Sequence, residues 1–192
     1  SKYPNIVTAH NNRGIDYLEQ GDIAQAISNF DKIIENQPNF EEAYNNRGIA
    51  YKAQGNIRQA IFDYNKAIEL KPSYAEAYDN RGDAYIEQGN IAQAISDYSK
   101  AIEVDPKFVA AYCSRGTIYS QQGNFTQAIA DLSRAIELNP GLAEAYNNRG
   151  VAYYLVKEYA LAWADVHKAE ELGYVVNPEF LNALKKASGR DK

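Results

Sequence analysis

The clearest pattern along the chain is an apolar stripe with helical spacing. Its members in the segment 57–68 recur every three or four residues, as on one face of an α-helix. A stretch rich in alanine and aromatic residues precedes it and ends at Gly55, which can adopt the left-handed conformation that terminates a helix. Asn56 then provides an N-cap, with Gln59 three residues on, as in a capping box. The pattern predicts two antiparallel helices joined by a tight turn. The stripe comprises Ile57, Ala60, Ile61, Tyr64, Ala67 and Ile68.

This two-helix pattern repeats every thirty-four residues. A fixed period of this size is typical of solenoids, in which each repeat buries its apolar face against its neighbours. Helices shorter than about 12 to 15 residues are marginal in water by themselves, so packing between repeats must hold them. The sequence therefore predicts a stacked array. The recurring positions are Gly14, Gly48, Gly82, Gly116 and Gly150; Tyr17, Tyr51, Tyr85, Tyr119 and Tyr153; Ala26, Ala60, Ala94, Ala128 and Ala162; and Pro38, Pro72, Pro106 and Pro140.

The period divides the chain into five repeats, followed by one more helix. The fifth repeat departs from the others, with Lys157 in place of the glycine and Trp163 in place of an isoleucine. After it, Asn177 reads as an N-cap and Pro178 as a first helical residue, which predicts a helix that caps Trp163. The predicted boundaries are 7–40, 41–74, 75–108, 109–142 and 143–176 for the repeats, 177–188 for the capping helix, and 1–6 and 189–192 for the tails.

Packing within a repeat is predicted to use small residues. Gly48 is expected to face Ala60 and Ala67, so that the two helix axes approach closely. The isoleucines of the second helix are then left to pack against the next repeat. The prediction is small residues within a repeat and large residues between repeats.

The repeated pattern resembles the tetratricopeptide repeat (TPR) over nearly the whole chain. That resemblance implies an all-α fold, a right-handed superhelical α-solenoid of five TPR helix pairs plus a C-terminal capping helix. It also implies a concave groove, lined by the first helices, that binds peptides or proteins. The chain is therefore expected to be a protein–protein interaction scaffold and not an enzyme. The residues that carry the resemblance in the second repeat are Tyr44, Arg47, Gly48, Tyr51, Ala60, Tyr64, Ala67 and Pro72.

One position departs from the family pattern, because arginine replaces the usual leucine in every repeat. On a helical wheel Arg47 falls between Tyr44 and Tyr51, on the inward side of the first helix. A buried guanidinium needs a partner, so we predict ion pairs with aspartates of the second helices, within a repeat or across to the next. The alternative is that each arginine lays its stem on tyrosine rings and keeps its head in water. The two sets are Arg13, Arg47, Arg81, Arg115 and Arg149, and Asp63, Asp97, Asp131 and Asp165.

Amide side chains recur on the face of the first helices that should line the groove. A row of amides offers donors and acceptors to peptide main chain, and it resembles the asparagine ladder of some family members. The alternative is a solvated polar face, which alanine, glutamate or lysine would serve better. Acidic residues on the same face favour a ligand with some basic and some apolar side chains. The candidate groove residues are Asn11, Asn12, Ile15, Glu42, Asn45, Asn46, Ile49, Glu76, Asp79, Asn80, Asp83, Ser114, Asn147 and Asn148.

Another known TPR binding mode, a clamp of lysines and arginines for a terminal carboxylate, is not expected. The positions that would form it carry neutral or acidic side chains, and Lys52 is a single exception at the rim. Two other readings of the chain remain open beside the peptide groove. The repeats could self-associate into a homo-oligomer through the first repeat, or the segment could be the recognition arm of a larger protein.

The composition of the chain argues against several other classes of function. A formal net charge of -5, with 23% charged residues, indicates a soluble, mildly acidic protein and argues against nucleic acid as the main partner. No apolar run approaches the roughly 18 residues of a membrane span. His10 and His167 lie far apart and Cys113 is the single cysteine, so neither a metal site nor a cofactor is expected. The chain has no methionine and begins at Ser1, as expected of an excised segment; it could be cytoplasmic or, if a signal was removed, exported.

Overall fold

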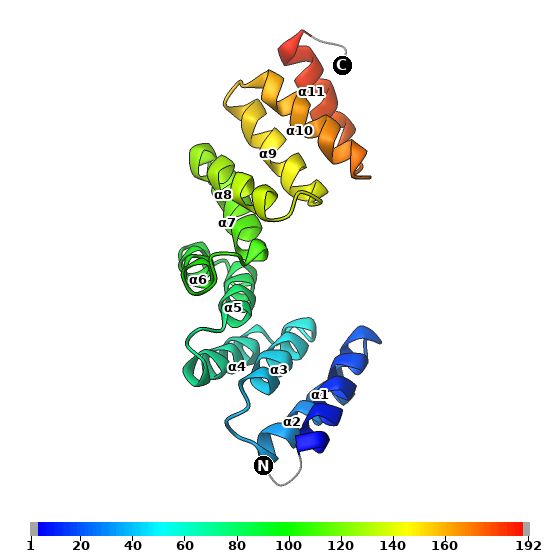
Figure 1. Ribbon diagram of the computed structural model, residues 1–192, viewed down its shortest axis with the longest axis vertical. Coiled ribbons are helices and arrows are strands. Elements are labelled where there is room, and N and C mark those ends of the chain that lie inside the picture. Colours follow the sequence, from blue (N-terminus) through cyan, green and yellow to red (C-terminus); the bar gives the residue numbers. More distant parts are fainter. Residues whose placement is uncertain (1–3, 190–192) are drawn as a thin grey trace. The chain divides into compact units, whose positions relative to one another are not determined.

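The structure is all-helical wherever it is described. This computed structural model describes the backbone of residues 4–189 and the side chains of residues 7–189. That part of the chain contains α-helices and no strand (Figure 1). The helices are α1 (Pro4–Glu19), α2 (Ile23–Asn36), α3 (Glu41–Ala53), α4 (Ile57–Leu70), α5 (Ala75–Glu87), α6 (Ile91–Val104), α7 (Val109–Gln121), α8 (Phe125–Leu138), α9 (Ala143–Leu155), α10 (Tyr159–Glu171) and α11 (Pro178–Ser188).

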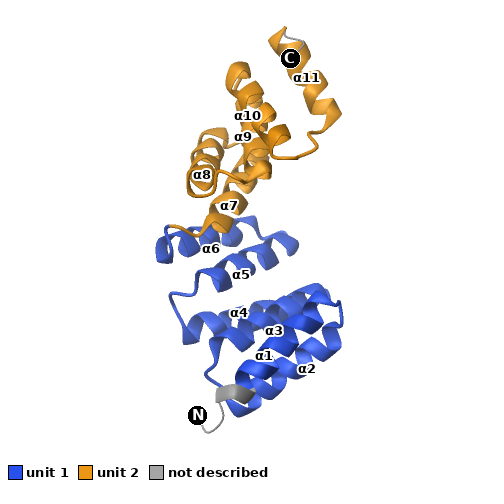
Figure 2. Cartoon of the chain, turned by 45° about the vertical axis from the view of Figure 1, so that its right-hand side comes forward, with its two compact units in different colours: residues 1–106 blue, residues 107–192 orange. Residues whose placement is uncertain are grey.

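The chain divides into two compact units, which are described separately. Unit 1 spans Ser1–Pro106 and holds α1 to α6, while unit 2 spans Lys107–Lys192 and holds α7 to α11 (Figure 2). Within each unit every helix packs against the helix that follows it. The predicted all-α solenoid of helix pairs is therefore confirmed. The division into five repeats with the boundaries given above stays a prediction.

The predicted Asp or Asn residues occupy the N-cap of the second helix in the first four repeats. Asp22 and Asn56 accept hydrogen bonds from the backbone N–H of Gln25 and Gln59, at 3.2 and 3.4 Å. Asn90 and Asn124 also occupy N-cap positions, but their side chains do not make this bond. The predicted N-cap hydrogen bond is thus formed in the first two repeats and not in the next two.

The helix α1 begins at Pro4, within the predicted N-terminal tail of residues 1–6. Proline suits the first turn of a helix, where its missing N–H costs nothing. Residues 1–3 and 190–192 lie outside the described part. At the other end Gly189 has φ 65° and forms the left-handed C-cap of α11.

In the first three repeats an aromatic ring, and not a pair of alanines, faces the glycine of the first helix. A Cβ added at Gly48 would lie 2.6 Å from Cε1 of Tyr64, and one at Gly82 would lie 2.6 Å from Cε1 of Tyr98. Both tyrosine rings are almost fully buried. The prediction that Gly48 faces Ala60 and Ala67 is therefore wrong. The absence of a side chain at Gly48 makes room for the ring, and not for closer contact between small residues.

The helix α11 covers the indole of Trp163, as the sequence predicts. Trp163 and Leu184 belong to one buried cluster, against which Phe180 packs. The indole Nε1–H donates to Ser188 Oγ at 3.0 Å, which satisfies the one polar atom of the buried ring. Lys157 takes φ 66° at the position of the missing glycine, so the turn before α10 keeps its geometry at some conformational cost.

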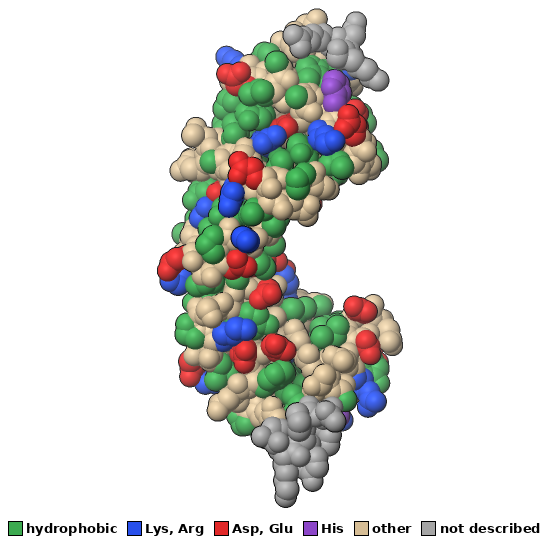
Figure 3. Space-filling model, viewed as in Figure 1, with side chains coloured by type: hydrophobic (Ala, Val, Ile, Leu, Met, Phe, Trp, Pro, Cys, Tyr) green, Lys and Arg blue, Asp and Glu red, His purple; other side chains and the backbone are tan. Residues whose placement is uncertain are grey.

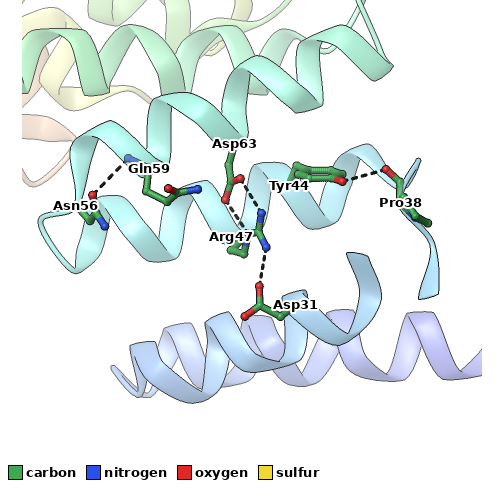
Figure 4. A network of polar contacts seen from close by, with 7 residues as sticks. All are labelled: Asp31, Pro38, Tyr44, Arg47, Asn56, Gln59 and Asp63. Atoms are coloured by element: carbon green, nitrogen blue, oxygen red, sulfur yellow. Dashed lines mark hydrogen bonds and ion pairs between the residues drawn. The ribbon is translucent and has the colours of Figure 1, made fainter. Parts of the chain in front are cut away.

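Arginine–aspartate pairs join the helices of four repeats. Arg47 of α3 donates from Nε and Nη2 to the two carboxylate oxygens of Asp63 in α4, both at 2.8 Å. Its Nη1 donates to Asp31 of the preceding helix α2 at 2.6 Å (Figure 4). The same bidentate geometry joins Arg81 to Asp97 at 2.6 to 2.7 Å. The corresponding pairs in unit 2 are Arg115 with Asp131 and Arg149 with Asp165.

The predicted pairing within a repeat is confirmed at these four arginines, and Arg47 also pairs with Asp31 of the preceding repeat. Tyrosine rings flank the guanidinium groups, with Arg47 Cζ lying 5.6 Å from the centre of the Tyr44 ring. Arg13 differs, because it is exposed and Asn29 stands where the other repeats have aspartate. Asn29 contacts His10 instead, at 3.0 Å. The first repeat thus lacks the ion pair.

Replacing Arg81 with glutamine should strongly destabilise unit 1. The change leaves the buried carboxylate of Asp97 without its cation, and breaking such a pair typically costs about 3 to 5 kcal/mol. Urea unfolding followed by circular dichroism measures the loss. The exposed Arg13→Gln is the matched control and should have a much smaller effect. Equal losses for the two variants would contradict a structural role for the pair.

Candidate functional site

The predicted groove residues of unit 1 lie on α1, α3 and α5. Asn12, Glu42 and Glu76 are exposed, whereas Asn45 is only 4% exposed. The others are half-buried: Asn11, Ile15, Asn46, Ile49, Asp79, Asn80 and Asp83. In unit 2 the predicted residues are half-buried as well, on α7 and α9: Ser114, Asn147 and Asn148.

Amides of neighbouring first helices bind one another in unit 1. Asn46 Nδ2 donates to Asn11 Oδ1, and Asn80 Nδ2 donates to Asn45 Oδ1, each at 3.0 Å. Residues thirty-five apart are thus linked across α1, α3 and α5. We call these four residues, Asn11, Asn45, Asn46 and Asn80, the amide row. Asn12 does not take part in either bond.

The amide row keeps part of its hydrogen-bonding capacity. An asparagine amide has two N–H donors and an oxygen with two lone pairs. Asn46 and Asn80 each use one donor in the bonds above, which leaves each a second N–H and its carbonyl oxygen. The row links neighbouring first helices, and these donors and acceptors remain beyond those links.

Unit 2 has a shorter set of polar contacts on its first helices. Asn148 Nδ2 donates to Thr117 Oγ1, and Asn147 Nδ2 donates to Asn148 Oδ1, each at 3.2 Å. The first of these links α9 to α7. Ser114 lies on α7, three residues before Thr117.

An ion pair crosses from α3 to α5 in unit 1. Lys52 Nζ lies 3.0 Å from Asp83 Oδ2, and Tyr98 of α6 donates its hydroxyl to Asp83 Oδ1 at 2.9 Å. Sequence reasoning included Asp83 but missed Lys52 and Tyr98 as its partners. The available signal was that aspartate stands at position 83, where the preceding repeat has Ile49, and that Tyr98 follows it by fifteen residues.

The counterpart of Tyr98 in the preceding repeat has no such acceptor. The Tyr64 ring lies over Gly48 as the Tyr98 ring lies over Gly82. Ile49 stands where Asp83 would be, so the hydroxyl of the fully buried Tyr64 has no hydrogen-bond partner within the described part of the chain. Its pKa is raised by burial and, next, by the charge of Asp83.

Asp79 is the second residue with an unsatisfied buried atom. Its Oδ1 is buried and lacks a hydrogen-bond partner among the described residues. Burial raises the pKa of Asp79 to about 7, with further contributions from the charges of Asp83 and Glu76. Lys52 lowers this pKa in part. The carboxyl group therefore changes charge near neutral pH.

Other features of the surface do not suggest chemistry. A depression of about 450 Å³, lined by Tyr78, Arg81 and Asp97 among others, lies on α5 and α6 and shares no residue with the predicted groove. Within the described residues, no cluster of histidine, cysteine and acidic side chains could hold a metal ion. Basic and acidic side chains are interspersed on the face shown in Figure 3. None of the helices described is both long and apolar enough to cross a membrane.

Comparison with protein families identifies the class of this chain. A family profile described as TPR repeat matches residues 14–55, 82–123 and 116–156. Two profiles described as tetratricopeptide repeat match residues 41–74 and 63–96. The chain belongs to the TPR family. Repeats of this family bind protein partners and are generally not enzymes, so the chain is a protein-interaction scaffold.

Solved structures agree with this assignment, although a search of curated proteins gave no match. The crystal structure of MamA protein is 28% identical, covers 87% of this chain and 91% of its own, and has a TM-score of 0.72. PilF of Pseudomonas aeruginosa has a TM-score of 0.89 at 20% identity, covering 98% and 87% of the two chains. YrrB, described as a TPR protein with an unusual peptide-binding site, has a TM-score of 0.67 at 20% identity, covering 93% and 90%.

Replacing Tyr64 or Tyr98 with phenylalanine should affect stability differently. Tyr64→Phe removes a hydroxyl that has no partner, so stability should stay the same or rise, because such a group costs about 1 to 3 kcal/mol. Tyr98→Phe removes a donor to a carboxylate and should cost about 1.5 to 3 kcal/mol. Urea midpoints compare the two. Similar losses in both would contradict the difference in bonding.

Asp79→Asn should alter the pH dependence of stability. Because the pKa of Asp79 is raised on folding, the native state holds a proton more tightly than the unfolded chain. The free energy of unfolding of the natural protein should therefore fall as pH rises from about 4 to about 7, relative to the variant. Above this window the variant should be more stable by up to about 4 kcal/mol. Urea unfolding over the pH series measures the difference.

The control for this prediction is Asp16→Asn, which removes an exposed carboxylate from α1. It should keep the slope of the natural protein between about pH 4 and pH 7. A slope for Asp79→Asn equal to that of the control would show that Asp79 is already ionised throughout the window.

Proposed function

We propose that the chain binds an extended peptide segment of a protein partner along the face of unit 1 formed by α1, α3 and α5. The amide row is the asparagine ladder that holds the peptide main chain. The single observation that carries this proposal is the pair of amide bonds, Asn46 to Asn11 and Asn80 to Asn45, each at 3.0 Å. These bonds fix the orientation of the amides before a ligand arrives.

Orientation matters because it lowers the entropic cost of binding. An exposed asparagine loses side-chain freedom when it binds a ligand, whereas one already bonded to its neighbour loses less. Asn46 and Asn80 each present a further N–H and a carbonyl oxygen, which match the alternating acceptors and donors of a peptide backbone. The recognition is therefore of main chain and tolerates different ligand sequences.

Side chains around the row set a preference among peptides. Ile15 and Ile49 are half-buried on the same helices and provide apolar contact. Glu42 and Glu76 are exposed and favour basic side chains through opposite charge. We assign Asn147 and Asn148, with Ser114, to a second and shorter row in unit 2. The fold similarity to YrrB, which is described as having an unusual peptide-binding site, supports a peptide as the ligand class.

The proposal is tested with peptides selected from a random library displayed against the full chain. The double variant Asn46→Ala, Asn80→Ala should weaken their binding about tenfold, since each lost hydrogen bond contributes about 0.5 to 1.5 kcal/mol. Isothermal titration calorimetry measures the affinity. Asn36→Ala on α2, an exposed helical asparagine outside the face, is the matched control and should bind normally.

A second test changes the peptide instead of the protein. A purely structural role of the amide row would not affect its result. N-methylation of the selected peptides at single positions should weaken binding at alternate residues, because it removes backbone donors. Alanine replacement of most ligand side chains should be tolerated. Light scattering on the same samples shows whether the binding species is monomeric. Unchanged affinity of the double variant would refute this face as the binding site.

A further inference from the structure

The turn between α9 and α10 in unit 2 carries three exposed apolar side chains (Figure 1). Leu155 ends α9, Val156 follows it, and Leu161 lies in the first turn of α10. These side chains are 46%, 39% and 46% exposed. Single exposed apolar residues are normal on a soluble protein, whereas a group of them at one place indicates an interaction surface. We call these three residues the apolar turn.

The equivalent positions are polar in nearly all of the other repeats. Every one of the first four repeats has glutamine where the fifth has Val156, and again where it has Leu161. Almost all of these glutamines are exposed, so the packing of the repeats does not require an apolar residue at either position. The apolar turn is therefore a feature of the fifth repeat alone. The glutamines are Gln20, Gln54, Gln88 and Gln122 at the first position, and Gln25, Gln59, Gln93 and Gln127 at the second.

Two charged residues in the same turn cost local stability. Lys157 has φ 66° where the first four repeats have glycine, and a lysine adopts this conformation only at a cost in energy. Glu158 occupies the N-cap of α10, where the other repeats have aspartate or asparagine, and it makes no cap hydrogen bond. Local backbone strain is most often found at functional sites. Both replacements are explained if the two side chains have a role outside their own repeat.

The charges of Lys157 and Glu158 indicate what the apolar turn contacts. Both side chains are exposed, and neither forms an ion pair with another residue in the described part of the chain. They are adjacent and have opposite charges. A two-fold axis beside the turn would place Lys157 of one copy opposite Glu158 of the other, and the reverse, so that both charges are paired. A base next to an acid is in this way complementary to itself.

From these observations we propose that the apolar turn, together with Lys157 and Glu158, is an interface for a second copy of this chain. The apolar side chains of the two copies bury one another, and the two ion pairs fix their alignment. The surface is smaller than the about 800 Å² per partner of a standard interface, so the dimer is weak and depends on concentration. The inference goes beyond the proposed function, because it concerns the fifth repeat and not the peptide face of unit 1.

The first test measures association of the full chain by sedimentation equilibrium, from micromolar to millimolar concentration. The natural protein should pass from monomer to dimer over this range. The double variant Val156→Gln, Leu161→Gln should raise the dissociation constant at least about tenfold, because it removes the apolar contact. It should keep its circular dichroism spectrum, since four repeats already have glutamine at both positions.

The matched control for this test is Val175→Gln. Val175 is an apolar residue of unit 2 that is 88% exposed, but it lies beyond the other end of α10. This variant should dimerise as the natural protein does. A loss of association equal to that of the double variant would show that any exposed apolar residue has the same effect.

The second test concerns the paired charges. Lys157→Glu and Glu158→Lys each place like charges opposite one another, so each variant alone should dimerise about tenfold more weakly. An equal mixture of the two variants brings opposite charges together again, and it should form heterodimers about as tightly as the natural protein forms homodimers. Lys157→Gly removes the cost of the positive φ; it should unfold at a higher temperature and yet dimerise more weakly.

A natural protein that stays monomeric at millimolar concentration would overturn the interface and assign the apolar turn to a different protein. A dimer that the double variant leaves unchanged would also overturn it. If the mixed charge variants associate no more tightly than each alone, the two-fold pairing is wrong. The double variant should bind peptides with the affinity of the natural protein, so failure of the interface and failure of the proposed function are distinguishable.

Discussion

A buried positive charge fixes the rotation of the first helix in most of the repeats. Arg47 lies within the interface between helices, where an unpaired guanidinium would cost several kcal/mol. Its bonds to Asp63 and Asp31 join α3 to the helix after it and to the helix before it. Turning α3 by one residue, about 100°, would break all of these bonds. The gain in net stability is limited, because burial raises the pKa of Asp63 even with Arg47 beside it. The main effect of the pairs is to allow only one rotation of the first helix about its own axis.

The proposed binding face depends on that rotation. Asn45 and Asn46 directly precede Arg47, so the rotation that places the guanidinium inside the repeat also places these amides beside the neighbouring first helices. There they form bonds of 3.0 Å with Asn80 and Asn11. One side of α3 therefore carries the buried ion pair, and the adjacent side carries the amide row. The same arrangement at Arg81 orients Asn80.

Repetition makes the exceptions in the third repeat easy to interpret. Asp79 and Asp83 replace an asparagine and an isoleucine of the second repeat, and each replacement brings charge to a half-buried position. Asp83 finds two partners, in Lys52 and Tyr98, whereas Asp79 Oδ1 finds none among the described residues. Two equivalent positions therefore carry neutral side chains in the second repeat and acidic side chains in the third.

The sequence alone determined the helix pairs and the chemistry of their interfaces. Glycines such as Gly55 mark helix ends because few other residues adopt φ 82°, and a buried arginine predicts an aspartate because its charge must be balanced. Only the tertiary structure decided which side chains meet. Gly48 faces Tyr64 instead of alanine, and Asn46 bonds to Asn11. Such contacts depend on the angle between neighbouring helices, and the repeat period of the sequence does not encode that angle. The pKa of Asp79 likewise follows from its burial and from charges on two helices, and those are properties of the folded surroundings.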